Sequence, residues 1–144
     1  MRPVVYSGDM GELIAKYHEN FAGRNQECVS LVQAETDIGH TSRWKPGIKV
    51  VDQNFIAPGT IIANFVFNNG VARYPNRSGW HVAIFLSFGP RDSKGQYTNI
   101  WVVDQWRGSV VARRSKKAFS DQEARKMQVR ASNNANEYYI VNVP

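Results

Sequence analysis

The apolar pattern of the chain changes partway along, and this change constrains the fold more than any other feature. Between residues 10 and 39 apolar side chains recur at three-to-four spacing, which predicts helices over 10–21 and from Cys28 to Gly39, with Asp9 as the first N-cap. From residue 60 onward the apolar residues form β-branched and aromatic runs, which predict five strands: 60–67, 80–88, 97–106, 109–112 and 137–143. Helices followed by a meander indicate an α+β domain with N-terminal helices packed on an antiparallel β-sheet.

The segments between these elements are interpreted mostly as loops. Residues 22–27 and 40–58 lack a regular apolar period and hold several Gly and Pro residues. Ser120 stands three residues before Glu123, which is capping-box spacing and predicts a short helix over 121–127. Because there is no internal repeat and no long linker, we expect residues 1–144 to form a single domain.

Composition excludes some classes of protein. Of the 144 residues, 42% are hydrophobic and 21% are charged, which is typical of globular domains. No apolar run approaches the length of a membrane span, so we expect no membrane insertion, and the first residues lack the apolar core of a secretory signal. A single cysteine permits no internal disulfide, so the fold does not depend on an oxidising compartment.

The charge balance favours an anionic partner. Lys and Arg number 18 against 12 Asp and Glu, for a formal net charge of +6. Nucleic acid, a membrane surface and a bacterial wall polymer all carry the complementary charge. The basic residues are only loosely clustered, and no recognised nucleic-acid motif accompanies them, so nucleic-acid binding remains a minor hypothesis.

The only cysteine, Cys28, follows a polar loop and begins a predicted helix. A helix N-terminus favours a thiolate over a thiol, because its free N–H groups and partial positive charge stabilise the anion. This position is typical of a nucleophile. The alternative is that Cys28 is a small buried apolar residue, as free cysteines often are.

A nucleophilic cysteine needs a base and a group that orients the base. Of the three histidines, His18 lies out of phase with the apolar face of its helix and His40 stands in a loop without an evident partner, whereas His81 opens a strand. Asp104 ends the next strand, so an antiparallel hairpin would bring it beside His81. We therefore predict Cys28 as nucleophile, His81 as base and Asp104 as orienting acid.

An acyl-transfer site also needs donors for the developing oxyanion. The backbone N–H of Cys28 is one candidate, and a side-chain amide of Gln26 or Asn25 is the second. Four aromatic residues are candidates to line a substrate groove, although aromatic residues are also common in cores: Trp44, Tyr74, Trp80 and Trp106. We expect no metal and no cofactor.

Three segments together resemble the CHAP and NlpC-type cysteine amidases, which are papain-like enzymes that cut peptide or amide bonds in bacterial peptidoglycan. The segments are residues 25–33 around Cys28, 78–85 around His81 and 103–108 around Asp104, and residues 58–63 resemble the family's first core strand. The chain departs from the family pattern twice: Trp106 stands where many CHAP members have Asn, and Thr60 stands where the family has Asp after Pro-Gly.

The resemblance implies a hydrolase that forms an acyl-enzyme at Cys28 and has peptidoglycan as its partner. A small amidase of this kind resembles an antibacterial effector that is made in the bacterial cytoplasm and exported by a type VI secretion machine to the periplasm or cell wall. Its producer would keep a cognate immunity protein. A phage lysin, acting after lysis, is the close alternative. A catalytically silent domain that binds wall polymer or nucleic acid, and a protein deamidase or thiol protease, stay open as different functions.

Overall fold

The computed structural model describes all 144 residues, which form an α+β domain of three α-helices and nine strands. The helices are α1 (Met10–Tyr17), α2 (Cys28–Glu35) and α3 (Asp121–Met127). The strands are β1 (Arg2–Pro3), β2 (Lys45–Lys49), β3 (Ile61–Ala63), β4 (Val66–Asn68), β5 (Val71–Arg73), β6 (Val82–Phe88), β7 (Asn99–Trp106), β8 (Ser109–Lys117) and β9 (Tyr139–Val143). Short 3₁₀ turns cover Thr41–Arg43, Val50–Asp52, Ala131–Asn133 and Ala135–Glu137.

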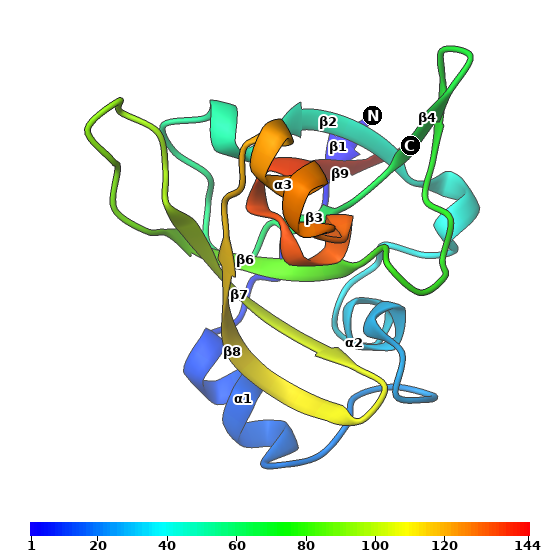
Figure 1. Cartoon of the computed structure of the whole chain (residues 1–144). Coiled ribbons are helices and arrows are strands. Elements are labelled where there is room, and N and C mark those ends of the chain that lie inside the picture. The colour runs from blue at the N-terminus through cyan, green and yellow to red at the C-terminus, as the bar shows by residue number, and fades with distance from the viewer.

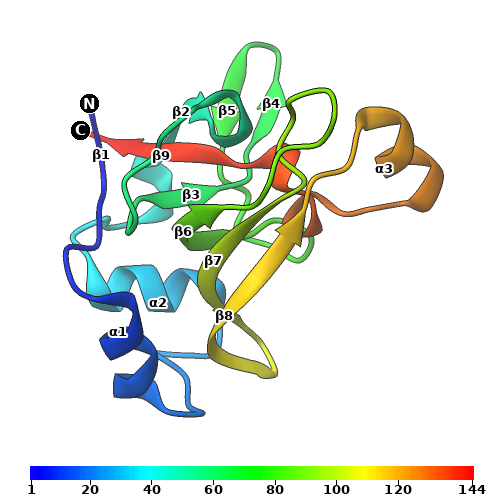
Figure 2. The ribbon, with the colours of Figure 1, turned by 90° about the vertical axis from the view of Figure 1, so that its left-hand side faces the viewer.

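Seven of the strands make one sheet in the order β1-β9-β3-β6-β7-β8, with β2 also paired to β9, and β4 and β5 form a separate hairpin. Every pairing is antiparallel. The predicted α+β class and antiparallel sheet are therefore confirmed. The two ends of the chain lie side by side, because Arg2 of β1 pairs with Val143 of β9 (Figures 1 and 2).

The central strands are buried on both faces. Ile61 and Ile84 belong to one apolar cluster, whereas their neighbours Ile62 and Phe85 belong to a second cluster. Successive side chains of a strand point to opposite faces, so two covered faces require nearly continuous apolar sequence. This explains why the strands appear in the sequence as apolar runs rather than as an alternating pattern.

The first cluster joins the two N-terminal helices to the sheet. Leu13 of α1 and Leu31 of α2 are buried in it together with Ile84 of β6 and Val103 of β7. Figure 2 shows α1 and α2 next to each other on one side of the sheet, while α3 stands apart beyond the end of β8. No residue of α3 is buried. The structure contains no helix that is long and apolar enough to cross a membrane.

Both N-terminal helices are shorter than predicted. The first ends at Tyr17 rather than residue 21, because His18 and Glu19 adopt positive φ angles of 27° and 59°, which do not continue a right-handed helix. The second ends at Glu35 rather than near Gly39. Its C-cap is Thr36, which has an extended backbone conformation. The N-cap role of Asp9 is confirmed, since its side chain accepts from the backbone N–H of Glu12.

The strand predictions need three corrections. The predicted 60–67 strand is divided into β3 and β4, because the backbone and side chain of Asn64 bond to other segments. The predicted 40–58 loop contains β2, which pairs with the distant β9. The predicted 109–112 strand continues to Lys117 along β7. The capping box of Ser120 and Glu123 is confirmed at the start of α3.

Candidate active site

Cys28 is the first residue of α2 and lines a cavity of about 550 Å³. Tyr74 lies beside it in this cavity, and Trp80 and Trp106 form other parts of the wall. The cysteine is partly exposed rather than sealed in the core. A partly exposed thiol at a helix start, facing a cavity, fits a nucleophile better than a packing residue.

The polar loop before Cys28 is held by a residue from β7. The buried Gln105 side chain accepts from the Ala22 N–H at 2.7 Å. Its amide nitrogen donates to the carbonyls of Ala22 at 3.0 Å, Asn25 at 3.4 Å and Glu27 at 2.8 Å. Gln105 therefore fixes the backbone on both sides of residues 23–26. These bonds hold the loop, and with it Cys28, next to β7.

Gly23 completes this loop. It has a φ of 79°, and a Cβ at this position would lie 2.5 Å from the Ser30 carbonyl oxygen. Only glycine combines that backbone conformation with such a close approach. The loop can therefore pack tightly against α2 at this point.

His81 lies just before β6 and is bonded to Asp104 of β7 at 2.7 Å, from Nε2 to Oδ2. The antiparallel pairing of β6 and β7 brings the two residues together, as the sequence indicated. The backbone of His81 is also fixed, because its N–H donates to Asn64 Oδ1 at 3.0 Å and its carbonyl accepts from the Asn64 N–H at 3.0 Å. Since Nε2 faces the carboxylate, Nδ1 is the nitrogen left for the thiol.

The Asp104 carboxylate has two further cations around it. Arg114 Nη1 lies 2.8 Å from Oδ1, and Lys116 Nζ lies 3.5 Å from Oδ2. Asp104 itself is 0% exposed. A fully buried carboxylate needs such partners, because burial without them would favour its neutral form.

The hydroxyl of Tyr74 lies 3.4 Å from the Cys28 sulfur. Its ring is held by two aromatic neighbours, Trp44 with centroids 4.8 Å apart and Phe65 with centroids 6.4 Å apart. Tilted and edge-on arrangements of this kind restrict the ring. The hydroxyl is therefore a fixed polar group next to the sulfur.

The protonation equilibria of the three residues are coupled. Burial raises the pKa of the Cys28 thiol, but hydrogen bonding to His81, the charge of His81 and the Tyr74 hydroxyl together bring the pKa below its ordinary value of 9.0. Burial lowers the pKa of His81, and its bonds to Asp104 and Cys28 more than offset this, so the His81 pKa is raised above 6.5. Burial raises the pKa of Asp104, while His81, Lys116 and Arg114 bring it below 3.8. The shifts of Cys28 and His81 both act in the direction of a thiolate beside an imidazolium.

The structure does not bring every predicted site residue to the thiol. Trp44 is 1% exposed and packs in the core, so its assignment to the groove wall is wrong. Gln26 Oε1 accepts from the Gly108 N–H at 3.2 Å, and Asn25 Oδ1 accepts from the Glu27 N–H and the Ser30 hydroxyl. Both amides are engaged in holding the loop, and neither lines the cavity beside Cys28.

Sequence reasoning missed three residues that organise the site: Asn64, Gln105 and the Lys116 next to Asp104. Asn64, between β3 and β4, and Gln105 of β7 are both buried amides within mostly apolar stretches of sequence. An amide within an apolar stretch is the sequence signal that could have identified them, because a buried amide must find hydrogen-bond partners. No group of three or more His, Cys, Asp or Glu side chains is arranged to hold a metal ion.

The fold and this geometry define a class: a small α+β protein with a cysteine at a helix start, facing a buried histidine–aspartate pair on an antiparallel sheet. Comparison with known proteins is consistent with that class and identifies one family within it. The family model for domesticated amidase effector 2 (Dae2) matches residues 6–141. A type VI secretion amidase effector 2 protein of Salmonella typhi is 38% identical over 130 residues, covering 83% of this chain and 86% of the relative. The solved structure of type 6 secretion amidase effector 2 (Tae2) superposes with a TM-score of 0.70 at 32% identity, covering 97% of this chain and 94% of that one.

The chain therefore belongs to the Dae2 family of type VI secretion amidase effectors.

Proposed function

We propose that this protein is a cysteine amidase with a papain-like site that hydrolyses amide bonds in the stem peptides or cross-links of bacterial peptidoglycan. The observation that carries the proposal is the chain of contacts from Cys28 through His81 to Asp104, with the thiol pKa lowered by the histidine. Membership of an amidase effector family supports amide hydrolysis as the reaction.

In this mechanism the Cys28 thiolate attacks the amide carbonyl carbon, and a C–S bond forms while the carbonyl π electrons move to oxygen. When the tetrahedral intermediate collapses, the C–N bond breaks and the leaving nitrogen takes the proton from His81 Nδ1. Water then enters and gives one proton to His81 as its oxygen attacks the thioester. The C–S bond breaks, which releases a carboxylic acid and restores the thiolate and imidazolium.

The oxyanion is stabilised in this proposal by the backbone N–H of Cys28 and by the Tyr74 hydroxyl. The first N–H groups of a helix have no partner within the helix, so the Cys28 N–H is available. The Tyr74 hydroxyl is close to the sulfur, and burial raises the tyrosine pKa well above its ordinary value, so it remains a proton donor. Tyr74 thus takes the role that the sequence suggested for Gln26 or Asn25.

The family also supports a biological role. We infer that the protein is made in the bacterial cytoplasm and delivered by a type VI secretion machine to the periplasm of a competing cell, where it degrades the wall. A producing cell exposed to the same enzyme would need a cognate immunity protein. The +6 formal charge suits an anionic polymer as substrate.

The proposal is tested by digesting purified peptidoglycan with wild type and with Cys28→Ala, followed by mass analysis of the released fragments. We expect wild type to release fragments whose summed masses exceed that of the uncut material by one water for each amide bond cut. Cys28→Ala should release none while keeping the wild-type melting temperature. A digest indistinguishable from the Cys28→Ala control would exclude the wall as substrate and favour the deamidase or binding functions.

A further inference from the structure

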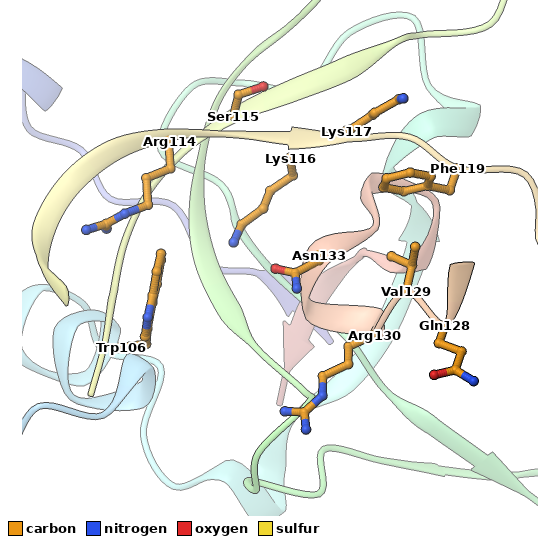
Figure 3. A pocket seen from close by; sticks show the side chains of 10 residues that line it. All are labelled: Trp106, Arg114, Ser115, Lys116, Lys117, Phe119, Gln128, Val129, Arg130 and Asn133. Atoms are coloured by element: carbon orange, nitrogen blue, oxygen red, sulfur yellow. The ribbon is translucent and has the colours of Figure 1, made fainter. Parts of the chain in front are cut away.

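A second cavity adjoins the one beside Cys28, and the two share four wall residues: Trp106, Lys116, Arg130 and Asn133. Figure 3 shows the second cavity, where the Lys116 amine points into the space between Trp106 and Asn133. We call it the far cavity. Because Lys116, Arg130 and Asn133 line both cavities, a substrate bound at Cys28 lies next to these three side chains.

The far cavity is lined by four basic side chains and no acidic one: Arg114, Lys116, Lys117 and Arg130. Arg114 is occupied by Asp104 and by the Val110 carbonyl. Arg130 donates to the Ser78 hydroxyl at 3.0 Å but has no carboxylate within 4.0 Å. The basic groups therefore outnumber the anions that could neutralise them.

The excess of positive charge is energetically unfavourable at Lys116, because this residue is buried and only 7% exposed. Its one carboxylate partner, Asp104, is already bonded more closely by His81 and Arg114. A buried ammonium that shares a carboxylate with two other cations lacks a full counter-charge, and the Trp106 ring face at 5.1 Å supplies only part of it. An anion placed between Lys116 and Arg130 would reduce the excess of positive charge, and the Asn133 side chain also lines this space as a possible hydrogen-bond donor (Figure 3).

We propose that the far cavity binds a free carboxylate of the substrate, so that the enzyme selects peptides with an ionised acidic group near the cleaved amide bond. This rests on the proposed function and names the substrate class of that same site. Lysine and arginine together suit a carboxylate, because charge-assisted hydrogen bonds to ionised acceptors are about twice as strong as neutral ones. Replacing the carboxylate by a carboxamide removes the charge while keeping the shape.

The test uses two synthetic stem-peptide fragments that are identical except that one carries the carboxylate and the other the carboxamide. We expect wild type to prefer the carboxylate fragment about tenfold in kcat/KM. In Arg130→Gln the preference should fall toward unity, and in Arg130→Glu it should fall below unity. Arg113→Gln is the matched control, because Arg113 stacks on Trp101 at 4.4 Å and lines neither cavity.

Binding to Cys28→Ala separates this proposal from the proposed function. Calorimetry with the two intact fragments measures the carboxylate preference without any turnover, and the same preference should disappear in Cys28→Ala/Arg130→Gln. Equal affinity for the two fragments in Cys28→Ala, or an unchanged preference in both Arg130 variants, would overturn the carboxylate site. Fragments that bind with the expected preference but are never cut by wild type would instead overturn the amidase function.

Discussion

At the scale of single residues, the reactivity of Cys28 should depend on His81. Burial alone raises the thiol pKa, and the histidine is the main influence that lowers it. We therefore expect His81→Gln to shift the pH dependence of iodoacetamide alkylation of Cys28 to higher pH than in wild type. At neutral pH the variant should be alkylated more slowly, because less thiolate is present. Identical profiles for the two proteins would show that His81 does not set the state of the thiol.

Tyr74 offers a second residue-scale prediction, because its hydroxyl lies 3.4 Å from the Cys28 sulfur. Tyr74→Phe should lower kcat by about 100-fold, the loss usual for one oxyanion donor, while the protein stays folded. Tyr17→Phe is the matched control, since that hydroxyl contacts Glu35 rather than Cys28. Single-turnover rates with a peptide substrate separate the effect on chemistry from an effect on binding. A loss confined to KM would assign Tyr74 to the groove wall alone.

At the scale of elements, Gln105 connects β7 to the loop that precedes α2. Its amide satisfies four backbone groups, and it is 0% exposed. Gln105→Met preserves size but leaves the buried N–H and carbonyl of Ala22 without their partner and removes the donor to the Asn25 and Glu27 carbonyls. We expect a loss of about 3 kcal/mol in the free energy of unfolding, measured by urea denaturation, because each unsatisfied buried group costs about 1–3 kcal/mol. A change below about 0.5 kcal/mol would mean that the loop is held by other contacts.

The elements also show how far the sequence could predict the fold. Local signals were sufficient for the helix starts, where Asp9 and Ser120 cap the chain through their own side chains. The pairing of His81 with Asp104 could also be predicted, because consecutive strands of a meander are neighbours. In contrast, β2 is an isolated short strand whose partner β9 lies far along the chain, and no local pattern specifies that pairing. The break at Asn64 depends on contacts with distant segments in the same way.

The same distinction between local sequence signals and long-range contacts applies to the residues of the site. Cys28, His81 and Asp104 have side chains whose chemistry is unusual at those positions, so their types and order were informative. Gln26 and Asn25 were assigned from sequence proximity to Cys28, but the loop turns their amides toward Gly108 and Ser30. Trp44 was assigned from its aromatic character, which fits a core equally well. Side-chain direction in a loop is set by tertiary contacts and is not encoded in spacing.

At the scale of the whole molecule, the positive charge gathers along one continuous part of the chain. Seven basic residues stand on β8, on α3 and just after α3: Arg113, Arg114, Lys116, Lys117, Arg125, Lys126 and Arg130. Only some of these line the cavities next to Cys28. We expect the others, such as Arg125 and Lys126, to attract an anionic polymer through the overall electrostatic field rather than through a specific contact. Long-range attraction and local recognition of a carboxylate should therefore respond differently to salt.

This difference gives a prediction for the intact protein. Cys28→Ala should sediment with insoluble peptidoglycan at about 0.05 M NaCl and be largely released at about 0.5 M, because salt screens charges beyond a few ångströms. Adding Arg125→Gln and Lys126→Gln, which removes two of the positive charges, should weaken retention at low salt without changing the carboxylate preference of the far cavity. A charge-preserving control, Arg125→Lys with Lys126→Arg, should bind as well as its parent, and none of these changes touches a buried residue of α3. Retention that is equal at both salt concentrations would show that the protein holds the wall through short-range contacts in the groove, and the charge on α3 would then have no part in binding.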